Sequence, residues 1–293
     1  MRATLIYNAN AAATETLAAA SIVRTLATIG VSAKVPAING ERDLKDALRD
    51  PGDLVIAAGG DGTVRATALA LYHLRRKVPL ALLPLGTANN VARTLGLTAP
   101  PQTLLMGLAK PRPRPFDLGV ARGPWGTVYF LEAFGAGLLA RGFTDYLGAG
   151  ANVVRAARAI STLASYRAQP WSLQLDGADL SGRYLLVEVM NTASVGLRVA
   201  LAPEADPSDG LFDLVLVRED ERVGWTAYVT SLISGRLEAL PNVTVTKGRR
   251  LELTWDGSPL HYDEASLTGA QVDSTQVQVS SLPGALELWL PTL

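Results

Sequence analysis

The sequence predicts two parts of different fold class: an N-terminal α/β part built on a mostly parallel sheet, and a C-terminal antiparallel β-sandwich. Strand-like apolar runs alternate with helical periodicity through residues 3–96, the pattern of a doubly wound sheet with helices on both faces. A proline-rich segment follows at residues 110–115, and beyond it strand-like runs predominate. We therefore expect one domain at residues 1–115 and another at residues 116–293.

The N-terminal elements follow from periodicity and from the residues that punctuate it. Thr14 is suited to cap the first helix and Gly30 to end it, because threonine favours N-caps and glycine favours C-caps. Strands are expected at residues 4–7, 31–35, 54–58 and 80–83, and helices at residues 14–30, 41–49, 64–74 and 91–96.

The C-terminal elements are mostly short apolar runs without helical spacing. Residues 151–166 and 221–237 are the two exceptions, because their apolar residues recur along one helical face. Residues 110–115 alternate cations with prolines, which is typical of a stiff, solvated linker. Strands are expected at residues 117–121, 127–134, 171–176, 183–190, 211–217, 249–255, 276–280 and 286–290.

Composition excludes several classes of function. The formal net charge of the 293 residues is zero, so nothing global attracts nucleic acid. The chain has no cysteine, which excludes disulfides, thiolate metal sites and a cysteine nucleophile. No uncharged apolar stretch reaches the roughly 18 residues of a spanning helix, and the N-terminal apolar run is too short for a signal peptide. We expect a cytoplasmic protein whose membrane contact is peripheral.

The chain is organised around an apolar run at residues 54–58 that leads into Gly59-Gly60-Asp61-Gly62-Thr63 and then into helical spacing. Glycine lets the backbone approach a ligand closely, and the N–H groups at a helix start favour an anion. This loop can therefore hold a phosphate, whereas Asp61 would face a magnesium ion or a hydroxyl. The alternative is a steric β–α turn; the loop is neither a Walker A loop nor a dinucleotide fingerprint.

Two further polar segments follow expected strands of the same sheet. Asn8 comes after the first strand, and residues 86–90 come after the strand at residues 80–83. In parallel sheets, ligands bind beyond the carboxyl ends of the strands. We therefore expect both segments to lie at the same edge as the glycine loop.

Four motifs in order resemble the bacterial diacylglycerol kinase and lipid kinase family, which is related to sphingosine kinases and, more distantly, to NAD kinases. They are Gly59-Gly60-Asp61-Gly62-Thr63, Pro84-Leu85-Gly86-Thr87-Ala88-Asn89, Asp206-Pro207-Ser208-Asp209-Gly210-Leu211-Phe212-Asp213-Leu214 and Pro283-Gly284-Ala285-Leu286-Glu287-Leu288. The resemblance implies an NAD-kinase-like N-terminal sheet, ATP in a cleft between the domains, Mg²⁺, and phosphorylation of a lipid hydroxyl at the membrane surface. The C-terminal strand is expected to pack back on the N-terminal domain.

The resemblance also implies roles for single residues. Asp61 would orient the hydroxyl or the metal, and a structural magnesium site would be formed by Asp206, Asp209 and the carbonyl of Leu211. An ordinary turn is the alternative for that segment, because Pro-Ser-Asp-Gly is strong turn chemistry. The implied nucleotide-binding residues are Asn8, Gly59, Gly60, Asp61, Gly62, Thr63, Gly86, Thr87 and Asn89.

The sequence departs from the family pattern at the C-terminal Asp-Gly-Glu motif, whose glutamate is taken as the general base. Asp263 falls on the aspartate, Glu264 on the glycine and Ala265 on the glutamate. Either a local shift brings Glu264 into place or the base is missing, so Asp263 and Glu264 are catalytic candidates. Arg65 and Asn90 are further departures, since the family has asparagine and aspartate there.

Three functions follow from these observations. The first is an ATP- and Mg²⁺-dependent kinase of diacylglycerol or a similar lipid alcohol. The second is a nucleotide- or lipid-binding protein without competent chemistry, motivated by Ala265, Arg65 and Asn90. The third is a kinase of a soluble substrate such as NAD, motivated by the shared glycine loop. His261, close to the altered motif, is a weaker acid–base candidate. The lipid is not identified, and a homodimer stays open.

Overall fold

The computed structural model describes residues 1–9, 17–141, 166–220, 222–269 and 274–293. By its contacts the chain divides into two compact units, Met1–Asp117 with Pro283–Leu293, and Leu118–Leu282. The expected cap Thr14 and nearly all of the expected helix at residues 151–166 lie outside the described residues. The boundaries at residues 1–115 and 116–293 concern domains that fold by themselves, and they stay a prediction.

The first unit is built on a parallel sheet. Its strand order is β2 (Ser32–Lys34), β1 (Arg2–Tyr7), β3 (Leu54–Gly59), β4 (Leu80–Pro84) and the C-terminal end of β19 (Thr275–Leu290). β3 is buried along its whole length. A parallel strand that is covered on both faces needs such a continuous apolar run.

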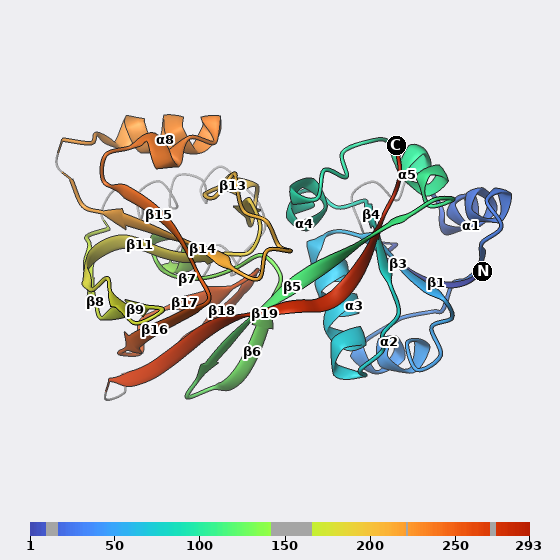
Figure 1. Ribbon diagram of the computed structural model, residues 1–293, viewed down its shortest axis with the longest axis horizontal. Coiled ribbons are helices and arrows are strands. Elements are labelled where there is room, and N and C mark those ends of the chain that lie inside the picture. Colours follow the sequence, from blue (N-terminus) through green and yellow to red (C-terminus); the bar gives the residue numbers. More distant parts are fainter. Residues whose placement is uncertain (10–16, 142–165, 221, 270–273) are drawn as a thin grey trace. The chain divides into compact units, whose positions relative to one another are not determined.

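Helices of the first unit cover both faces of this sheet. They are α1 (Ala19–Thr28), α2 (Glu41–Ala47), α3 (Asp61–His73), α4 (Asn90–Thr94) and α5 (Pro101–Gly107). α1 contacts α5 and α2 contacts α3, and Figure 1 shows these two pairs on opposite sides of the strands. α5 is absent from the sequence prediction. No helix within the described residues has the length and apolar character needed to cross a membrane.

The second unit contains two antiparallel sheets. The first has the order β10 (Ala178–Asp179), β9 (Leu173–Leu175), β16 (Arg250–Trp255) and the N-terminal part of β19. The second has the order β15 (Val243–Gly248), β14 (Phe212–Arg218), β11 (Gly182–Met190), β7 (Ala133–Gly137), β17 (Leu260–Tyr262) and β18 (Ala265–Leu267). Shorter pairings join β8 (Gln169–Trp171) to β11, β6 (Gly126–Phe130) to β5 (Arg112–Gly123), and β12 (Ser194–Val195) to β13 (Val199–Ala200).

The main core of the second unit takes side chains from both sheets. Leu251 and Leu253 of β16 belong to the same buried cluster as Val187 and Val189 of β11. The alternate residues of β11, such as Leu186, belong to a second buried cluster on the other face. A parallel sheet in one unit and an antiparallel sandwich in the other confirm the predicted fold classes.

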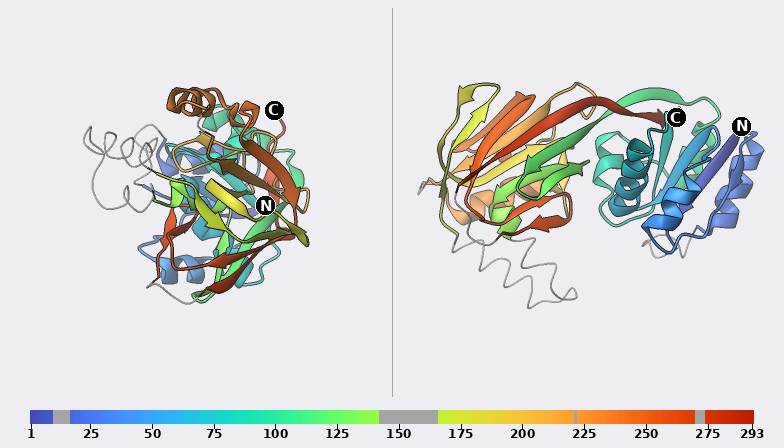
Figure 2. Two further views of the ribbon diagram at one scale, coloured as in Figure 1. Left: turned by 90° about the vertical axis from the view of Figure 1, so that its left-hand side faces the viewer. Right: turned by 90° about the horizontal axis from the view of Figure 1, so that it is seen from below.

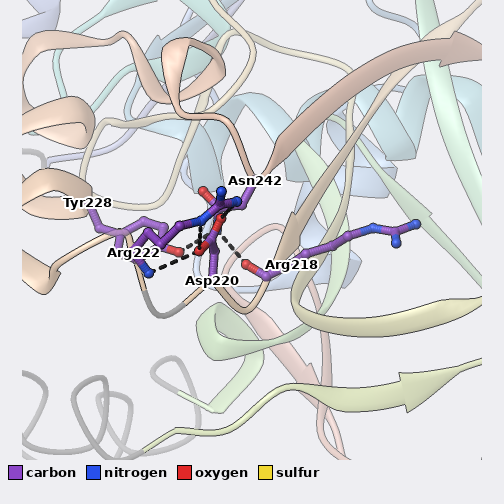
Figure 3. A network of polar contacts seen from close by, with 5 residues as sticks. All are labelled: Arg218, Asp220, Arg222, Tyr228 and Asn242. Carbon is purple, nitrogen blue, oxygen red and sulfur yellow. Dashed lines mark hydrogen bonds and ion pairs between the residues drawn. The ribbon is translucent and has the colours of Figure 1, made fainter.

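A polar network holds the helix that follows β14. Figure 3 shows Arg222 donating to both carboxylate oxygens of Asp220, at 2.9 and 2.7 Å, and these bonds lower the pKa of Asp220 to about 2. The side-chain amide of Asn242 donates to the carbonyl of Arg218 and to the hydroxyl of Tyr228. Tyr228 belongs to α8 (Trp225–Ser234), which precedes the 3-10 helix η1 (Leu237–Ala239), so α8 is tied to the ends of β14 and β15.

Two strands are longer than the sequence predicts. β5 begins at Arg112, so most of the expected linker is strand; its prolines are exposed, where a missing N–H costs little. β5 pairs with β19, which runs without interruption through Pro283 and Gly284 (Figure 2). Gly284 has a φ of +57° and donates its N–H to Asp117 Oδ1 at 2.7 Å. The two predicted C-terminal strands are therefore one.

Candidate functional site

The glycine loop forms the start of α3. The N–H groups of Thr63 and Val64 donate to the carbonyl of Gly60 at 3.0 and 3.1 Å, so the helix begins at Asp61, earlier than predicted. The N–H groups of Asp61 and Gly62 belong to the first turn, where no intrahelical acceptor exists. The loop therefore presents backbone donors at the positive end of a helix.

The second loop packs against the glycine loop so closely that only glycine fits between them. The N–H of Leu85 donates to the carbonyl of Gly59 at 2.9 Å. A Cβ atom added at Gly86 would lie 2.4 Å from the Cα atom of Gly60. A Cβ atom at Gly62 would meet nothing within 4 Å, so this position faces open space. The two loops meet at glycines on one side and leave Gly62 open on the other.

Asn8 lies next to the glycine loop, as the sequence predicts. Its N–H donates to the carbonyl of Ala58 at 3.1 Å, which continues the β1–β3 pairing by one residue. Its side-chain amide donates to Thr63 Oγ1 at 3.2 Å. The ends of β1, β3 and β4 therefore bring the three expected loops to one edge of the sheet.

Asn89 shapes the second loop from within. Its φ is +54°, in the left-handed region that asparagine tolerates better than most residues. Its Oδ1 accepts the N–H of Gly86 at 2.9 Å, and its Nδ2 donates to the carbonyl of Gly86 at 2.7 Å. Thr87 lies inside this closed turn and is exposed. Asn89 thus fixes the backbone that presents Thr87.

Asp61 joins the glycine loop to α4. The residue is 8% exposed, and its Oδ1 accepts the N–H of Val91 at 3.2 Å. Burial raises the pKa of Asp61, and the backbone N–H groups of Asn90, Val91 and Asn89 lower it in part. A buried carboxylate with a raised pKa is a better proton acceptor than an exposed one.

This edge of the sheet fits a polyphosphate. Backbone N–H groups at the start of α3 and the hydroxyl of Thr63 can donate hydrogen bonds to phosphate oxygens, and Gly62 leaves open space beside them. Asp61 is the carboxylate of the loop and is turned toward α4, so its charge is offset by backbone N–H groups. The arrangement can bind an anion and place one proton acceptor near it.

The altered C-terminal motif forms a two-residue turn between β17 and β18. Tyr262 pairs with Ala265, which leaves Asp263 and Glu264 at the tip. Asp263 has a φ of +48°. Glu264 is exposed, and no register shift brings it into the strand. The position that the resemblance gives to the general base is therefore occupied by Ala265.

Asp263 is 3% exposed, and its carboxylate accepts three consecutive backbone N–H groups. Leu131 donates at 3.1 Å, Glu132 at 2.8 Å and Ala133 at 3.3 Å. The N–H of Asp263 returns a bond of 2.8 Å to the carbonyl of Ala133. These bonds replace ladder bonds, which explains why the strand predicted at residues 127–134 is divided into β6 and β7.

Sequence reasoning missed a buried ion pair behind this turn. Nε2 of His261 lies 2.6 Å from Oε1 of Glu188, and both side chains are fully buried. The two residues are both register partners of Gly135, on opposite sides of β7. A Cβ atom at Gly135 would lie 2.0 Å from the Glu188 carboxylate, so glycine makes the pair feasible. A single glutamate within the apolar run of β11 was the available signal.

His261 also contacts the turn itself. Its Nδ1 lies 3.3 Å from the carbonyl oxygen of Asp263. Burial by itself lowers the pKa of His261, but the charge and hydrogen bond of Glu188 outweigh burial, so the pKa is raised. A protonated imidazole can donate to both partners at once. His261 therefore connects β11 to the turn at Asp263.

The expected magnesium ligands lie in the loop before β14. Asp206 Oδ1 accepts the N–H and the hydroxyl of Ser208, at 2.9 and 2.5 Å. Asp209 Oδ1 accepts the N–H of Leu211 at 2.9 Å, and its Oδ2 accepts Lys247 Nζ at 2.6 Å. Among the described residues no cluster of three or more acidic, histidine or cysteine side chains has a metal-binding arrangement. The carboxylate oxygens of Asp206 and Asp209 fit an ammonium group and a turn better than they fit Mg²⁺.

Comparison with known proteins gives two matching family models. The diacylglycerol kinase catalytic domain matches residues 2–121, and the YegS C-terminal NAD kinase beta sandwich-like domain matches residues 144–290. A Pseudomonas putida protein named "Probable lipid kinase YegS-like" is 30% identical over 86% of this chain and 82% of its own length. A Bacillus subtilis diacylglycerol kinase is 29% identical over 71% of this chain and 69% of its own length.

A solved structure shares the fold. The crystal structure of a diacylglycerol kinase from Bacillus anthracis matches with a TM-score of 0.69 at 20% identity, covering 99% of this chain and 96% of that chain. At this identity the likeness concerns the fold alone.

Proposed function

Because the chain belongs to the family that joins a diacylglycerol kinase catalytic domain to a YegS-type C-terminal domain, we propose that it is an ATP- and Mg²⁺-dependent lipid kinase. It transfers the γ-phosphoryl group to the hydroxyl of diacylglycerol or a similar lipid alcohol at the membrane surface. The observation that carries the proposal is the joining of the two nucleotide loops at Gly60 and Gly86, with Gly62 left open.

The first unit supplies the nucleotide-binding groups in this proposal. The N–H groups of residues 60–62 and the hydroxyl of Thr63 hold phosphate oxygens, and Asn8 orients Thr63 through its bond of 3.2 Å. Thr87 is presented by the turn that Asn89 closes. MgATP, when bound, supplies the phosphoryl group and the metal charge that offsets the phosphates.

Asp61 is the proposed proton acceptor or orienting carboxylate. Its bond from Val91 fixes its position, and burial raises its pKa toward the range where a carboxylate accepts a proton efficiently. Asp263 and Glu264 remain candidates of a different kind. Asp263 is committed to three backbone donors, so a positioning role fits it better than proton transfer, and Glu264 is the exposed carboxylate of the turn.

A labelling assay tests the proposal. The full chain is incubated with γ-labelled ATP, MgCl₂ and phosphatidylglycerol vesicles that contain diacylglycerol, with NAD as a soluble acceptor in a parallel reaction. We expect label in the lipid fraction and none in NADP. Absence of labelled lipid across vesicle compositions would contradict the proposal, and labelled NADP would assign the chain to a soluble substrate.

A matched pair of variants locates the activity. Thr63→Val removes the hydroxyl that Asn8 contacts, and we expect the lipid-labelling rate to fall at least about tenfold, the effect of one lost phosphate contact. Thr25→Val removes a hydroxyl that bonds the Ser21 carbonyl within α1 and should leave the rate unchanged. Equal rates in both variants would move the nucleotide away from the glycine loop.

A binding protein without turnover is the second candidate, and Ala265 in the first position of β18 favours it. Restoring the carboxylate with Ala265→Glu discriminates the two candidates. A general base contributes roughly 10²–10⁴-fold, so a gain of that size would show that the native chain lacks its base. A robust native rate without such a gain supports the kinase and a base elsewhere, with Asp61 the first choice.

A further inference from the structure

Four carboxylates surround the start of β14. Asp213 is a buried residue of β14, and Glu204, Asp206 and Asp209 belong to the loop that precedes the strand. Like charges at such a site repel one another, and one buried carboxylate among them needs a positive partner. In the proteins that the sequence resembles, a magnesium ion is the implied partner.

In this chain the partner is a lysine held by the strand register. Lys247 of β15 is the cross-strand neighbour of Asp213 of β14. Its Nζ lies 2.6 Å from Oδ2 of Asp209 and 3.8 Å from Oδ2 of Asp213. The Asp213 side chain is only 7% exposed, whereas that of Lys247 is 40% exposed. The ammonium therefore reaches a buried carboxylate from the surface and joins the loop to the sheet.

One oxygen of Asp209 and one of Asp206 accept hydrogen bonds from within the loop. Oδ1 of Asp209 accepts the N–H of Leu211, and Oδ1 of Asp206 accepts both donors of Ser208. Mg²⁺ requires a nearly octahedral set of oxygens at about 2.0–2.1 Å, which the ammonium on Asp209 excludes by charge and by space. A metal could enter only after Lys247 had left.

We propose that Lys247 is the resident cation of the loop at residues 206–213, so that this loop holds its structure without a metal ion. The ammonium takes the place that magnesium is implied to take in the family. The inference does not rest on the proposed kinase activity, because it concerns the folding of the second unit and not turnover. Any metal dependence of catalysis then belongs to the nucleotide alone.

Magnesium titration without nucleotide tests the proposal. The thermal midpoint of the full wild-type chain is measured in EDTA and in millimolar MgCl₂, with calorimetric titration of the same samples. We expect equal midpoints and no uptake of Mg²⁺. A wild-type midpoint that rises by several degrees with magnesium, together with stoichiometric uptake, would overturn the proposal whether or not the chain is a kinase.

Substitution of the lysine gives the complementary result. Lys247→Met leaves the carboxylates of Asp209 and Asp213 without a cation. We therefore expect the thermal midpoint of this variant to fall by about 2–4 °C in EDTA and to recover in part in MgCl₂. Lys247→Arg keeps the charge and should respond like wild type. Lys45→Met is the matched surface control, because Lys45 is about as exposed as Lys247 and its Nζ lies 2.6 Å from Oε1 of Glu41. This variant should show no magnesium response. A magnesium response of Lys247→Met no larger than that of Lys45→Met would contradict the proposal.

Discussion

The glycine loop of the first unit and the turn at Asp263 of the second unit both contain a buried aspartate that accepts backbone N–H groups. Asp61 accepts the N–H of Val91 at the start of α4, and Asp263 accepts three N–H groups between β6 and β7. Each aspartate joins two segments that are distant in sequence. They differ in what lies beside the aspartate.

Beside Asp61, the loop presents backbone N–H groups at the start of α3 and has an open side at Gly62. Beside Asp263, the following strand begins with Ala265, and the adjacent residue Glu264 is exposed at the tip. The comparison teaches that the motif aspartate accepts backbone N–H groups in both units, whereas only the glycine loop has all the residues that the resemblance implies. Binding and turnover can therefore be separated by substitution.

The largest expected effect comes from a substitution that forces the glycine loop and the second loop apart. Gly86→Ala would place a Cβ atom 2.4 Å from the Cα atom of Gly60, which is a backbone atom and cannot turn aside as the end of a flexible side chain can. We expect a loss of about 2–3 kcal/mol in the free energy of unfolding, the upper range for overpacking, with loss of nucleotide binding. Denaturant unfolding and calorimetric titration measure the two effects. Unchanged stability would show that the loops do not meet.

Asp263→Asn tests the structural half of the comparison. An uncharged amide cannot accept three N–H groups as well as a carboxylate does, so we expect a loss of roughly 2 kcal/mol in unfolding free energy. Nucleotide affinity should be unchanged, because Asp263 is proposed to act only on the β6–β7 segment. A variant as stable as wild type but without turnover would instead make Asp263 a catalytic residue.

The buried pair behind the turn predicts a pH dependence. The pKa of His261 is raised above its ordinary value of 6.5, so the pair stabilises the fold fully below that value and loses this contribution as pH rises through the folded pKa. We expect the free energy of unfolding to decline above about pH 6.5. Glu188→Gln should remove this decline, as measured by denaturant titrations across pH. The same slope in the variant would assign the dependence to another group.

The smallest effect is expected from the exposed pair in Figure 3. Arg222→Ala removes both bonds to Asp220, but the arginine side chain is 86% exposed and its ion pair is screened by solvent. We expect no measurable change in thermal midpoint. A clear fall would mean that α8 depends on this pair more than on the bonds of Asn242.

Local pattern predicted most of the first unit, because a buried parallel strand such as β3 is a continuous apolar run and its ends are marked by glycine or asparagine. The same reasoning failed where a distant partner decides the structure. The strand at residues 127–134 is divided by a carboxylate that comes 130 residues later, and no local signal at Leu131 announces this. β5 and β19 continue through prolines because their exposed residues do not need every ladder bond.

For the candidate site, local pattern predicted where the loops lie but not which residues contact them. The loops at Asn8, Gly59 and Gly86 were placed at one edge by the rule for parallel strands, and the structure brings them together. The hydrogen-bond and ion-pair partners of the candidate residues were not predictable from their spacing in the sequence. Val91 for Asp61 and Lys247 for Asp209 depend on contacts between segments far apart in sequence.

The central claim is that a polyphosphate binds at the open side of the glycine loop, and Gly62→Ala tests it most directly. The added methyl group meets nothing within 4 Å in the protein, and alanine favours a helix by about 0.5–1 kcal/mol over glycine. The measurement is calorimetric titration of wild type and variant with a non-hydrolysable ATP analogue and MgCl₂. The account predicts a variant at least as stable as wild type with affinity weakened tenfold or more. Equal affinity in the two proteins would contradict it.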